Sequence, residues 1–261
     1  MHPATDAYER LVAIVARLRR ECPWDRAQTP QSIKSLLIEE AYETVEAIDR
    51  EAWDELRGEL GDLLLHVLFH AVMAEEAGRF TLRDVLEGIA QKLVRRHPHV
   101  FGSTSVSGAE EVLRNWEQLK LAEGRRSALD GVPRNLPALL RAHRMQEKAS
   151  KVGFDWADPG PVWGKVREEL QEWQEAIRSG SPEDRRRELG DVLFALVNYA
   201  RFLGLNAEEA LQEANERFLA RFRYIEERLR EQGRTPQEAT LEEMDRLWEE
   251  AKARLPQGGT S

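Results

Sequence analysis

The sequence contains a single cysteine, Cys22, among its 261 residues. One thiol cannot form an internal disulfide, so a disulfide-stabilised extracellular scaffold is excluded and we expect a reducing compartment, the cytoplasm. The chain also lacks an apolar run long enough to cross a bilayer and a signal-peptide pattern at its start, so we expect no membrane partner. Aromatic residues make up only 7% of the chain, and segments with the alternating pattern of β-strands are almost absent.

The chain also has fewer basic than acidic residues. Asp and Glu number 47 against 38 Lys and Arg, which gives a formal net charge of −9. This balance disfavours a surface that binds nucleic acid nonspecifically. An acidic protein can still bind a polyanionic small molecule where a metal ion reverses the local field.

Helical periodicity, in contrast, is abundant. The spacing of Leu11, Val12, Val15 and Leu18 predicts a helix from Tyr8 to Arg20, and the following CPWDRAQTPQS is expected to form a loop. Capping residues and glycines such as Thr81 and Gly78 set the bounds of later helices. The other expected helices are one that carries Glu40 and Glu43, then 53–76, 81–97, one from Ser107 through Lys120, 138–151, 162–179, 183–203, 207–231 and 241–255.

The segment 123–137, EGRRSALDGVPRNLP, is rich in glycine, proline and charge, as interdomain linkers are. It would separate an N-terminal domain, residues 1–122, from a C-terminal domain, residues 138–261. A chain of 261 residues is long enough for two such domains, each with its own core. We therefore predict an all-α fold of two tandem helical bundles that arose by internal duplication.

Four acidic residues in each half support the duplication. Every acid of the first set recurs 129 residues later in the second, within the pattern ExxE, spacer, ExxD. Apolar and small positions keep the same offset, as Leu60 does with Leu189 and Gly61 with Gly190. The first set is Glu40, Glu43, Glu59 and Asp62, and the second is Glu169, Glu172, Glu188 and Asp191.

This spacing has a chemical consequence. Residues three apart share a helix face, so each set consists of two carboxylate pairs that converge if their helices pack antiparallel. Converging carboxylates repel one another and are costly to desolvate. A hard divalent cation, Mg²⁺ or its substitute Mn²⁺, removes that cost because it prefers oxygen ligands. A solvated surface is the usual fate of a single Glu, but it does not explain a repeated quartet.

Each set is followed by a basic helix and then by a tryptophan and a lysine one turn apart. Such cations could neutralise a polyphosphate, and the tryptophan could stack on a base. The alternative, in which the tryptophan packs in a core and the cations lie in water, stays open. The candidates for nucleotide binding are Lys92, Arg96, Trp116 and Lys120 in the first half and Arg217, Arg221, Trp248 and Lys252 in the second.

Three other functions compete with this interpretation. His66 and His70 have a spacing that can bind zinc, but the Glu of the HExxH motif is missing and the second half has Ala195 and Tyr199 there. These histidines are therefore expected to pack or to support the acids. A ferritin-like di-iron site would need Glu-x-x-His pairs, which neither quartet contains. A nucleotide-sensing or scaffold protein with a structural ion remains open.

A linked series of phrases carries a family resemblance over essentially the whole chain. These phrases are CPWD, EEAYE, GELGDLLLHVLFHA and RRHPHVFG in the first half, and KVGFDW, KVREELQEW, ELGDVLFALVN and ANERF in the second. They resemble the MazG nucleoside triphosphate pyrophosphohydrolases, of the all-α NTP pyrophosphohydrolase superfamily. The resemblance implies Mg²⁺-dependent hydrolysis of NTPs of broad specificity to NMP and pyrophosphate, in cleansing of the nucleotide pool by a homodimer.

The resemblance also favours the C-terminal copy as the working site. It implies Mg²⁺ ligands at Glu169, Glu172, Glu188 and Asp191, with a spare carboxylate, Glu172 or Glu168, activating the water. The nucleotide would lie near Arg217, Arg221, Trp248 and Lys252, where Arg217 replaces a common Lys. The apolar runs LLLHVLFHAVM and VLFALVNYA are expected to bury against a second copy, within the chain or across a homodimer.

Overall fold

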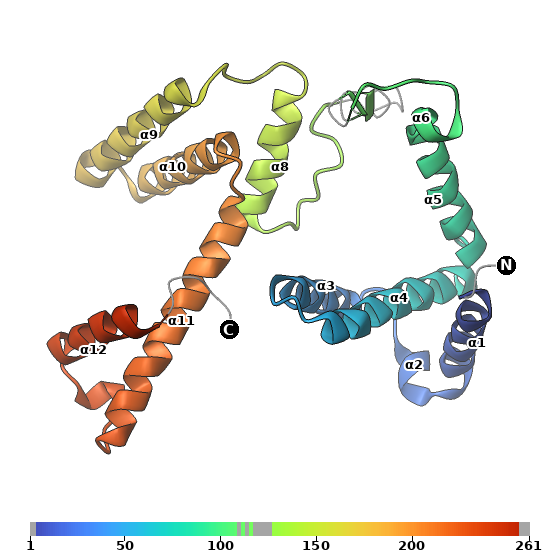
Figure 1. Cartoon of the computed structure of the whole chain (residues 1–261), viewed down its shortest axis with the longest axis horizontal. Coiled ribbons are helices and arrows are strands. Elements are labelled where there is room, and N and C mark those ends of the chain that lie inside the picture. Colours follow the sequence, from blue (N-terminus) through green and yellow to red (C-terminus); the bar gives the residue numbers. More distant parts are fainter. Residues whose placement is uncertain (1–3, 109–110, 113–114, 117–126, 256–261) are drawn as a thin grey trace. The chain divides into compact units, whose positions relative to one another are not determined.

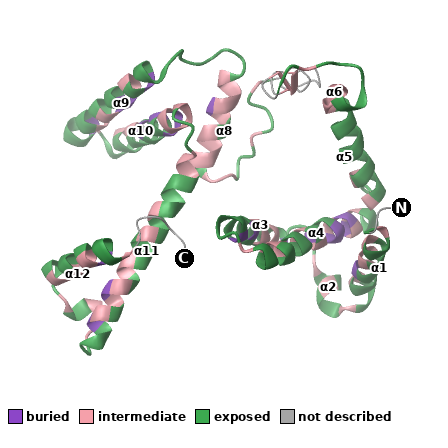
Figure 2. Cartoon of the chain, viewed as in Figure 1, coloured by how far each residue is buried: buried purple, intermediate pink, exposed green. Residues whose placement is uncertain are grey.

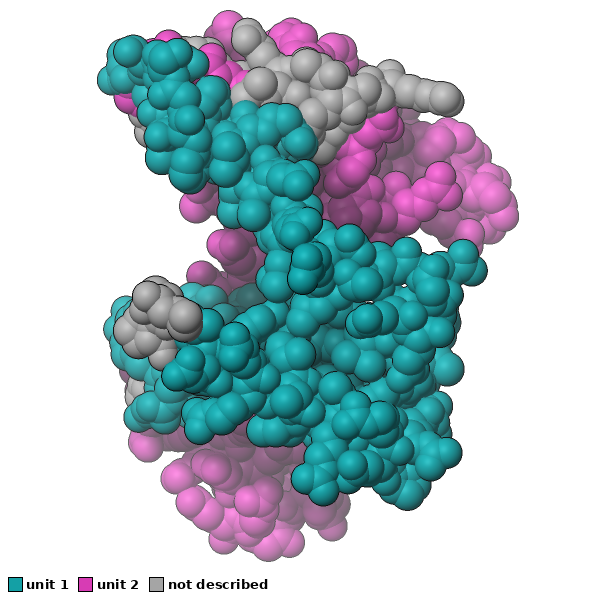
Figure 3. Space-filling view, turned by 90° about the vertical axis from the view of Figure 1, so that its right-hand side faces the viewer, with its two compact units in different colours: residues 1–107 teal, residues 108–261 magenta. Residues whose placement is uncertain are grey.

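A computed structural model of the chain describes residues 4–108, 111–112, 115–116 and 127–255. All regular structure in these ranges is helical, which confirms the predicted all-α class. The chain divides into two compact units, residues 1–107 and 108–261, which Figure 3 colours separately. The division precedes the segment 123–137, whose residues 123–126 lie outside the described ranges, so a linker there remains a prediction.

The first unit is organised around a helical hairpin. Helices α3 and α4 are joined by residues 50–52 and pack side by side, while α1 and α5 each contact α4. Val15, Ile33 and Leu68 form the centre of the buried core. The elements of the unit are α1 (Thr5–Glu21), α2 (Pro23–Ala27), α3 (Lys34–Asp49), α4 (Trp53–Glu76), α5 (Leu82–Arg96) and α6 (Pro98–Phe101) (Figure 1).

The segment CPWDRAQTPQS, expected to be a loop, contains the short helix α2. Pro23 occupies its first turn, where a backbone N–H would have no intrahelical partner, so proline is tolerated there. The carboxylate of Asp25, in the same turn, interacts favourably with the positive end of the helix dipole. Arg19 of α1 ties this region to α4, because its guanidinium donates to the Gln28 carbonyl at 3.0 Å and pairs with Glu76 at 2.8 Å. Tertiary contacts therefore stabilise a helix too short for periodicity to reveal.

The second unit repeats the hairpin. Helices α9 and α10 form its closest packed pair, α8 lies against α10, and α11 contacts α8 and α10 before it pairs with α12. Helix α9 begins at Pro159, three residues before the expected start, because Asp158 caps it by accepting from the Gly160 amide. The elements are α8 (Ala138–Ser150), α9 (Pro159–Ser179), α10 (Pro182–Phe202), α11 (Ala207–Glu231), the 3₁₀ helix η1 (Pro236–Glu238) and α12 (Leu241–Arg254) (Figure 1).

The turn between α9 and α10 determines how the two acidic helices face each other. A Cβ at Gly180 would lie only 2.8 Å from the Ala176 carbonyl oxygen, so a side chain there would force the turn open. Ser181 then caps α10 through a reciprocal capping box with Asp184. Arg185 also donates to the Ala176 carbonyl at 3.2 Å, which fastens the start of α10 to the end of α9.

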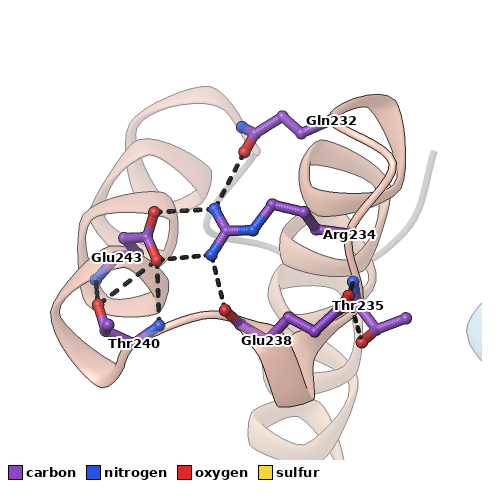
Figure 4. A network of polar contacts seen from close by, with 6 residues as sticks. All are labelled: Gln232, Arg234, Thr235, Glu238, Thr240 and Glu243. Atoms are coloured by element: carbon purple, nitrogen blue, oxygen red, sulfur yellow. Dashed lines mark hydrogen bonds and ion pairs between the residues drawn. The ribbon is translucent and has the colours of Figure 1, made fainter.

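A polar network holds the turn between α11 and α12 (Figure 4). Arg234 forms a two-pronged ion pair with Glu243, with both N–O distances 2.9 Å, and donates to the Glu238 carbonyl at 2.8 Å. Thr235 with Glu238, and Thr240 with Glu243, form capping boxes at the two following helices. The Arg234 guanidinium lowers the pKa of Glu243 to about 2, so this clamp is charged throughout the neutral range.

Both hairpins have many exposed residues in the single chain (Figure 2), and apolar side chains are among them. On α4, Leu60 and Val67 are about half exposed, and on α10, Leu193 and Phe194 are as well. Val67, Leu193 and Phe194 belong to the two apolar runs noted in the sequence, and Leu60 precedes the first run by one turn. Within the described ranges, none of the helices has both the length and the apolar character needed to cross a bilayer.

Candidate metal and nucleotide site

Three acids of the first quartet meet between α3 and α4. Oxygen atoms of Glu40, Glu43 and Glu59 all lie within 4.8 Å of one another. Asp62 is outside this group, although its charge acts on Glu40. The hairpin therefore brings the pair on α3 together with Glu59 of the pair on α4.

The carboxylates of the first site lie so close together that the pKa of two of them is raised. Burial and the charges of Asp62 and Glu43 raise the pKa of Glu40. Burial and the charges of Glu43 and Glu40 likewise raise the pKa of Glu59. Carboxylates that hold protons more tightly because of one another form a donor set that a hard divalent cation would relieve. The side chains present therefore fit such an ion.

The second quartet is arranged in the same way between α9 and α10. Oxygen atoms of Glu169, Glu172 and Glu188 lie within 4.8 Å of one another. Glu169 is buried, the Glu188 side chain is only 13% exposed, and Glu172 is exposed. Glu169 and Glu188 are therefore largely shielded from solvent, and Glu172 lies at the solvent-exposed edge of the set. This all-oxygen donor set fits Mg²⁺.

Two cations distinguish the second site from the first, and sequence reasoning missed both. Lys165 contacts Glu169 at 2.7 Å and Glu168 at 2.9 Å, and these partners raise its pKa. Arg187 contacts Glu188 at 2.8 Å. The i, i+4 spacing of Lys165 and Glu169 is the signal that could have revealed the first of them.

The first copy has no counterpart to either cation. At the same offset of 129 residues, Leu36 stands for Lys165 and Gly58 stands for Arg187. The second quartet is thus partly neutralised by its own chain, whereas Glu40 and Glu59 of the first remain in mutual repulsion. The two sites share the same acidic residues but differ in the charge around them.

A cavity of about 360 Å³ opens directly beside the second quartet. Glu169, Asp191 and Lys165 line one part of it, which places the fourth predicted acid at its wall. Loop residues Phe154 and Trp156 and residues of α8 and α10 form the rest. In the sequence, these two aromatics stood out only as part of the phrase KVGFDW. The cavity joins the acids to a mostly apolar chamber of the size that small-molecule ligands use.

The nucleotide-binding candidates of the second half cluster together, but on a different hairpin. Trp248 of α12 lies 5.4 Å from the Phe218 ring of α11, and the Arg221 guanidinium lies 5.4 Å above Trp248. Arg217 contacts Glu213 at 3.4 Å, and Lys252 contacts Glu249 at 2.8 Å. None of the four predicted residues lines the cavity beside Glu169.

The corresponding candidates of the first half are only partly visible. Lys92 and Arg96 lie on α5, the former exposed and the latter half-buried. Trp116 is half-buried, and Lys120 lies outside the described residues. The structure therefore does not place this set around the first acids.

The two histidines of α4 lie close together, as their one-turn spacing predicts. Their ring centroids are 6.2 Å apart, and His66 is buried. Burial and the neighbouring His66 lower the pKa of His70, which keeps its ring neutral. Among the described residues, the groups able to hold a metal contain glutamates alone. This argues against a zinc site built on the histidines.

Comparison with known proteins agrees with the repeated architecture. A family model described as the MazG nucleotide pyrophosphohydrolase domain matches residues 28–101 and 163–224. These two ranges contain both acid quartets, whereas Trp248 and Lys252 lie beyond them.

Individual relatives match over nearly the full chain. The nucleoside triphosphate pyrophosphohydrolase of Escherichia coli strain K12 is 47% identical over 94% of this chain and 96% of its own length. The nucleoside triphosphate pyrophosphohydrolase/pyrophosphatase MazG of Thermotoga maritima is 44% identical over 97% and 98%. The uncharacterized protein YabN of Bacillus subtilis is 49% identical over 92% of this chain but only 50% of its own length.

Proposed function

The chain belongs to the MazG nucleotide pyrophosphohydrolase family, and from this premise we propose that it hydrolyses nucleoside triphosphates to NMP and pyrophosphate with Mg²⁺ as cofactor. The observation that carries the proposal is the convergence of Glu169, Glu172 and Glu188 beside a ligand-sized cavity. The acids match a metal-bound triphosphate, and the cavity has room for the remainder of a nucleotide.

Glu169, Glu172, Glu188 and Asp191 would hold the ion. Bound there, Mg²⁺ would supply charge neutralisation for the triphosphate and would make a water molecule more acidic. Lys165 lies between the acids and the cavity, so its ammonium can neutralise a phosphate oxygen at the boundary. Mn²⁺ has the same preference for oxygen ligands and would substitute.

The acceptor of the water proton is a carboxylate near the cluster, and Glu172 and Glu168 are the candidates. Glu168 accepts a hydrogen bond from Lys165 at 2.9 Å, so its carboxylate is already engaged by that cation. Glu172 is exposed at the open edge of the acid cluster. The geometry therefore favours Glu172 for this role.

The second copy is proposed as the working site. Lys165 and Arg187 are present only there, where they hold Glu169 and Glu188 in place. The described cavity also adjoins the second quartet. The first copy can bind the same ion, but it lacks the cations that would receive a polyphosphate.

The biological role follows from the chemistry. A broad substrate range fits cleansing of the nucleotide pool, and the single Cys22 supports a reducing compartment such as the cytoplasm. The net charge of −9 supports nucleoside triphosphates, rather than nucleic acid, as partners.

Product analysis tests the reaction. Purified protein incubated with Mg²⁺ and each of the common NTPs is expected to release NMP and pyrophosphate in equal amounts, as measured by ion-exchange chromatography. The proposed mechanism, in which a metal-activated water attacks, requires no covalent enzyme intermediate. NDP and orthophosphate as the main products would contradict the proposal, and binding without turnover would indicate a sensor.

A homodimer would cover the apolar faces of α4 and α10. Leucines that are about half exposed, such as Leu193, gain roughly 1 kcal/mol each when they are buried, about half the value for a fully exposed side chain, which supports association. Leu193→Glu is therefore expected to give a monomer by light scattering at micromolar concentration, whereas the wild type is a dimer. Leu241→Glu is the matched control, because Leu241 is highly exposed in the first turn of α12. A monomeric wild type would refute the homodimer.

A further inference from the structure

The loop between α8 and α9, residues 151–158, forms part of the cavity wall beside the second quartet. Phe154, Asp155 and Trp156 of this loop all line the cavity. Phe154 is 80% exposed and Trp156 is 43% exposed, so packing holds these two aromatic side chains only weakly. Loops with few buried apolar contacts open easily, and the polar contacts of this loop therefore decide where its aromatic side chains lie.

The two ends of the loop are fixed by hydrogen bonds to the adjoining helices. The Phe154 amide donates to the Ala149 carbonyl oxygen at 3.1 Å, near the end of α8. The Asp158 carboxylate accepts from the Gly160 amide at 2.9 Å, at the start of α9. These bonds determine where the chain leaves α8 and enters α9, and the middle of the loop needs a further contact.

Arg201, in the last turn of α10, supplies that contact. Its guanidinium donates to both carboxylate oxygens of Asp155, at 2.9 and 2.7 Å. The Arg201 and Asp155 side chains are only 15% and 24% exposed, so this two-pronged ion pair is screened by solvent much less than a surface pair. The same carboxylate accepts from the Trp156 amide at 3.0 Å. Arg201 therefore acts on the Trp156 backbone through Asp155.

Arg201 is itself held in a fixed orientation. Its Nε and Nη2 atoms donate to the Asn198 side-chain oxygen at 3.0 and 2.9 Å, and Asn198 is buried. All three guanidinium nitrogens thus have protein acceptors, and the charge is paired with Asp155. Arg201 lines the cavity, but these contacts fit a residue that positions the loop better than one that binds a phosphate oxygen.

The first copy ties the corresponding segment in a different way. Val72 stands 129 positions before Arg201, so α4 has no cation at the equivalent place. Arg19 of α1 instead donates to the backbone carbonyl oxygens of Asp25 and Gln28. An arginine on the helix of the ExxD acids, paired with the loop carboxylate, is therefore a feature of the second copy, the proposed working site.

We infer that Arg201 is a positioning residue for the hydrolysis: through Asp155 it holds Phe154 and Trp156 in place as a wall of the cavity. The inference rests on the proposed function, in which the cavity receives the part of the nucleotide beyond the triphosphate. A loop that is held before the substrate arrives loses less freedom on binding, so the ion pair lowers the KM for an NTP. The loop does not reach the reacting phosphate, so kcat does not depend on it.

The test compares the full-length wild type with Asp155→Asn, Arg201→Gln and the double variant. Each single variant is expected to raise the KM for an NTP roughly tenfold with little change in kcat, the scale of one charged hydrogen bond that acts on binding alone. Because both residues act through one ion pair, the double variant is expected to raise the KM no further than the larger single effect. Inhibition by inorganic tripolyphosphate with Mg²⁺ is expected to stay at the wild-type value, since this ligand has no nucleoside.

Hydrogen exchange provides a measurement that does not depend on turnover. The amides of residues 152–158 are expected to exchange faster in both single variants, because the loop is no longer tied to α10, while the amides of α9 exchange at the wild-type rate. Arg201→Lys keeps the charge but loses the planar two-pronged geometry. It is therefore expected to restore part of the NTP affinity that Arg201→Gln loses.

Arg19→Gln is the matched control. The Arg19 side chain is 12% exposed, pairs with Glu76 at 2.8 Å and ties the corresponding segment of the first copy. This variant is expected to lower the temperature of unfolding but to keep the wild-type KM and kcat, because the first copy is not the proposed working site. Thermal unfolding shows whether each variant is folded, and Asp155→Asn decides the question if Arg201→Gln is not.

Four outcomes would overturn the inference. An unchanged KM in both single variants would show that the ion pair has no part in substrate binding. Weaker tripolyphosphate inhibition in Arg201→Gln, with stronger inhibition in Asp155→Asn, would make Arg201 a direct phosphate ligand. A higher KM without faster exchange of the loop, or an equal rise in Arg19→Gln, would indicate a general loss of structure. A wild-type protein that hydrolyses no NTP would overturn the proposed function as well, whereas the other three outcomes leave the hydrolysis intact.

Discussion

Asp191→Asn is expected to lower kcat by about 10²-fold or more, the scale of a lost electrostatic contact in a transition state. The substitution keeps the size of the side chain and removes the negative charge of a predicted metal ligand. Asp191 lines the cavity together with Glu169, so the substitution removes a negative charge at the place where the acids adjoin the cavity. Steady-state kinetics with saturating Mg²⁺ measure it.

The duplicated chain provides a matched control in Asp62→Asn. This residue holds the same position in the first quartet, where Leu36 and Gly58 replace the two cations of the second site. We expect this variant to retain a kcat close to that of the wild type. Equal losses from the two substitutions would indicate two working sites, and a loss confined to Asp62→Asn would reverse the assignment.

Removal of divalent cations with EDTA is expected to abolish hydrolysis, with a fall of about 10³-fold or more, since a metal contributes several kcal/mol of charge stabilisation. Without the ion, the carboxylates of Glu169, Glu172 and Glu188 would repel the triphosphate. Two cations line the cavity, and both are already paired: Lys165 contacts two acids, and Arg201 contacts Asp155. The rate is measured before and after dialysis against the chelator.

Adding ions back to the metal-free protein distinguishes the effect of a specific divalent ion from a general effect of salt. Mg²⁺ or Mn²⁺ is expected to recover the rate, whereas NaCl at the same ionic strength is not, because a monovalent ion cannot organise the carboxylates. A metal-free protein that turns over NTPs at the wild-type rate would contradict the assignment of the quartet as a metal site.

The helices were predictable where local signals are strong. The expected helix 53–76 and the expected helix 207–231 have the observed bounds of α4 and α11, because their apolar periodicity is long and their ends carry clear signals. Helix α2 was missed because five residues contain too little periodicity. Its stability depends on contacts with Arg19 and on the position of Pro23.

In the candidate site, too, features that depend on local spacing were predictable, and contacts between distant segments were not. The three-residue spacing of Glu40 with Glu43, and of Glu169 with Glu172, already placed each pair on one helix face. The repeat offset identified the pairs as equivalent. In contrast, the proximity of Trp248 to the acids was an expectation drawn from resemblance, and within the chain Trp248 instead packs with Phe218 and Arg221.

The sequence by itself determined the all-α class, the duplication, the identity of the acids and the family, because these depend on local periodicity and on spacing along the chain. Only the tertiary structure decided which acids of the two helices meet and that Gln146 and Asn198 line one cavity. Gln146 and Asn198 lie on different helices, 52 positions apart in the chain. Their meeting depends on how α8 packs against α10, which local sequence patterns do not encode.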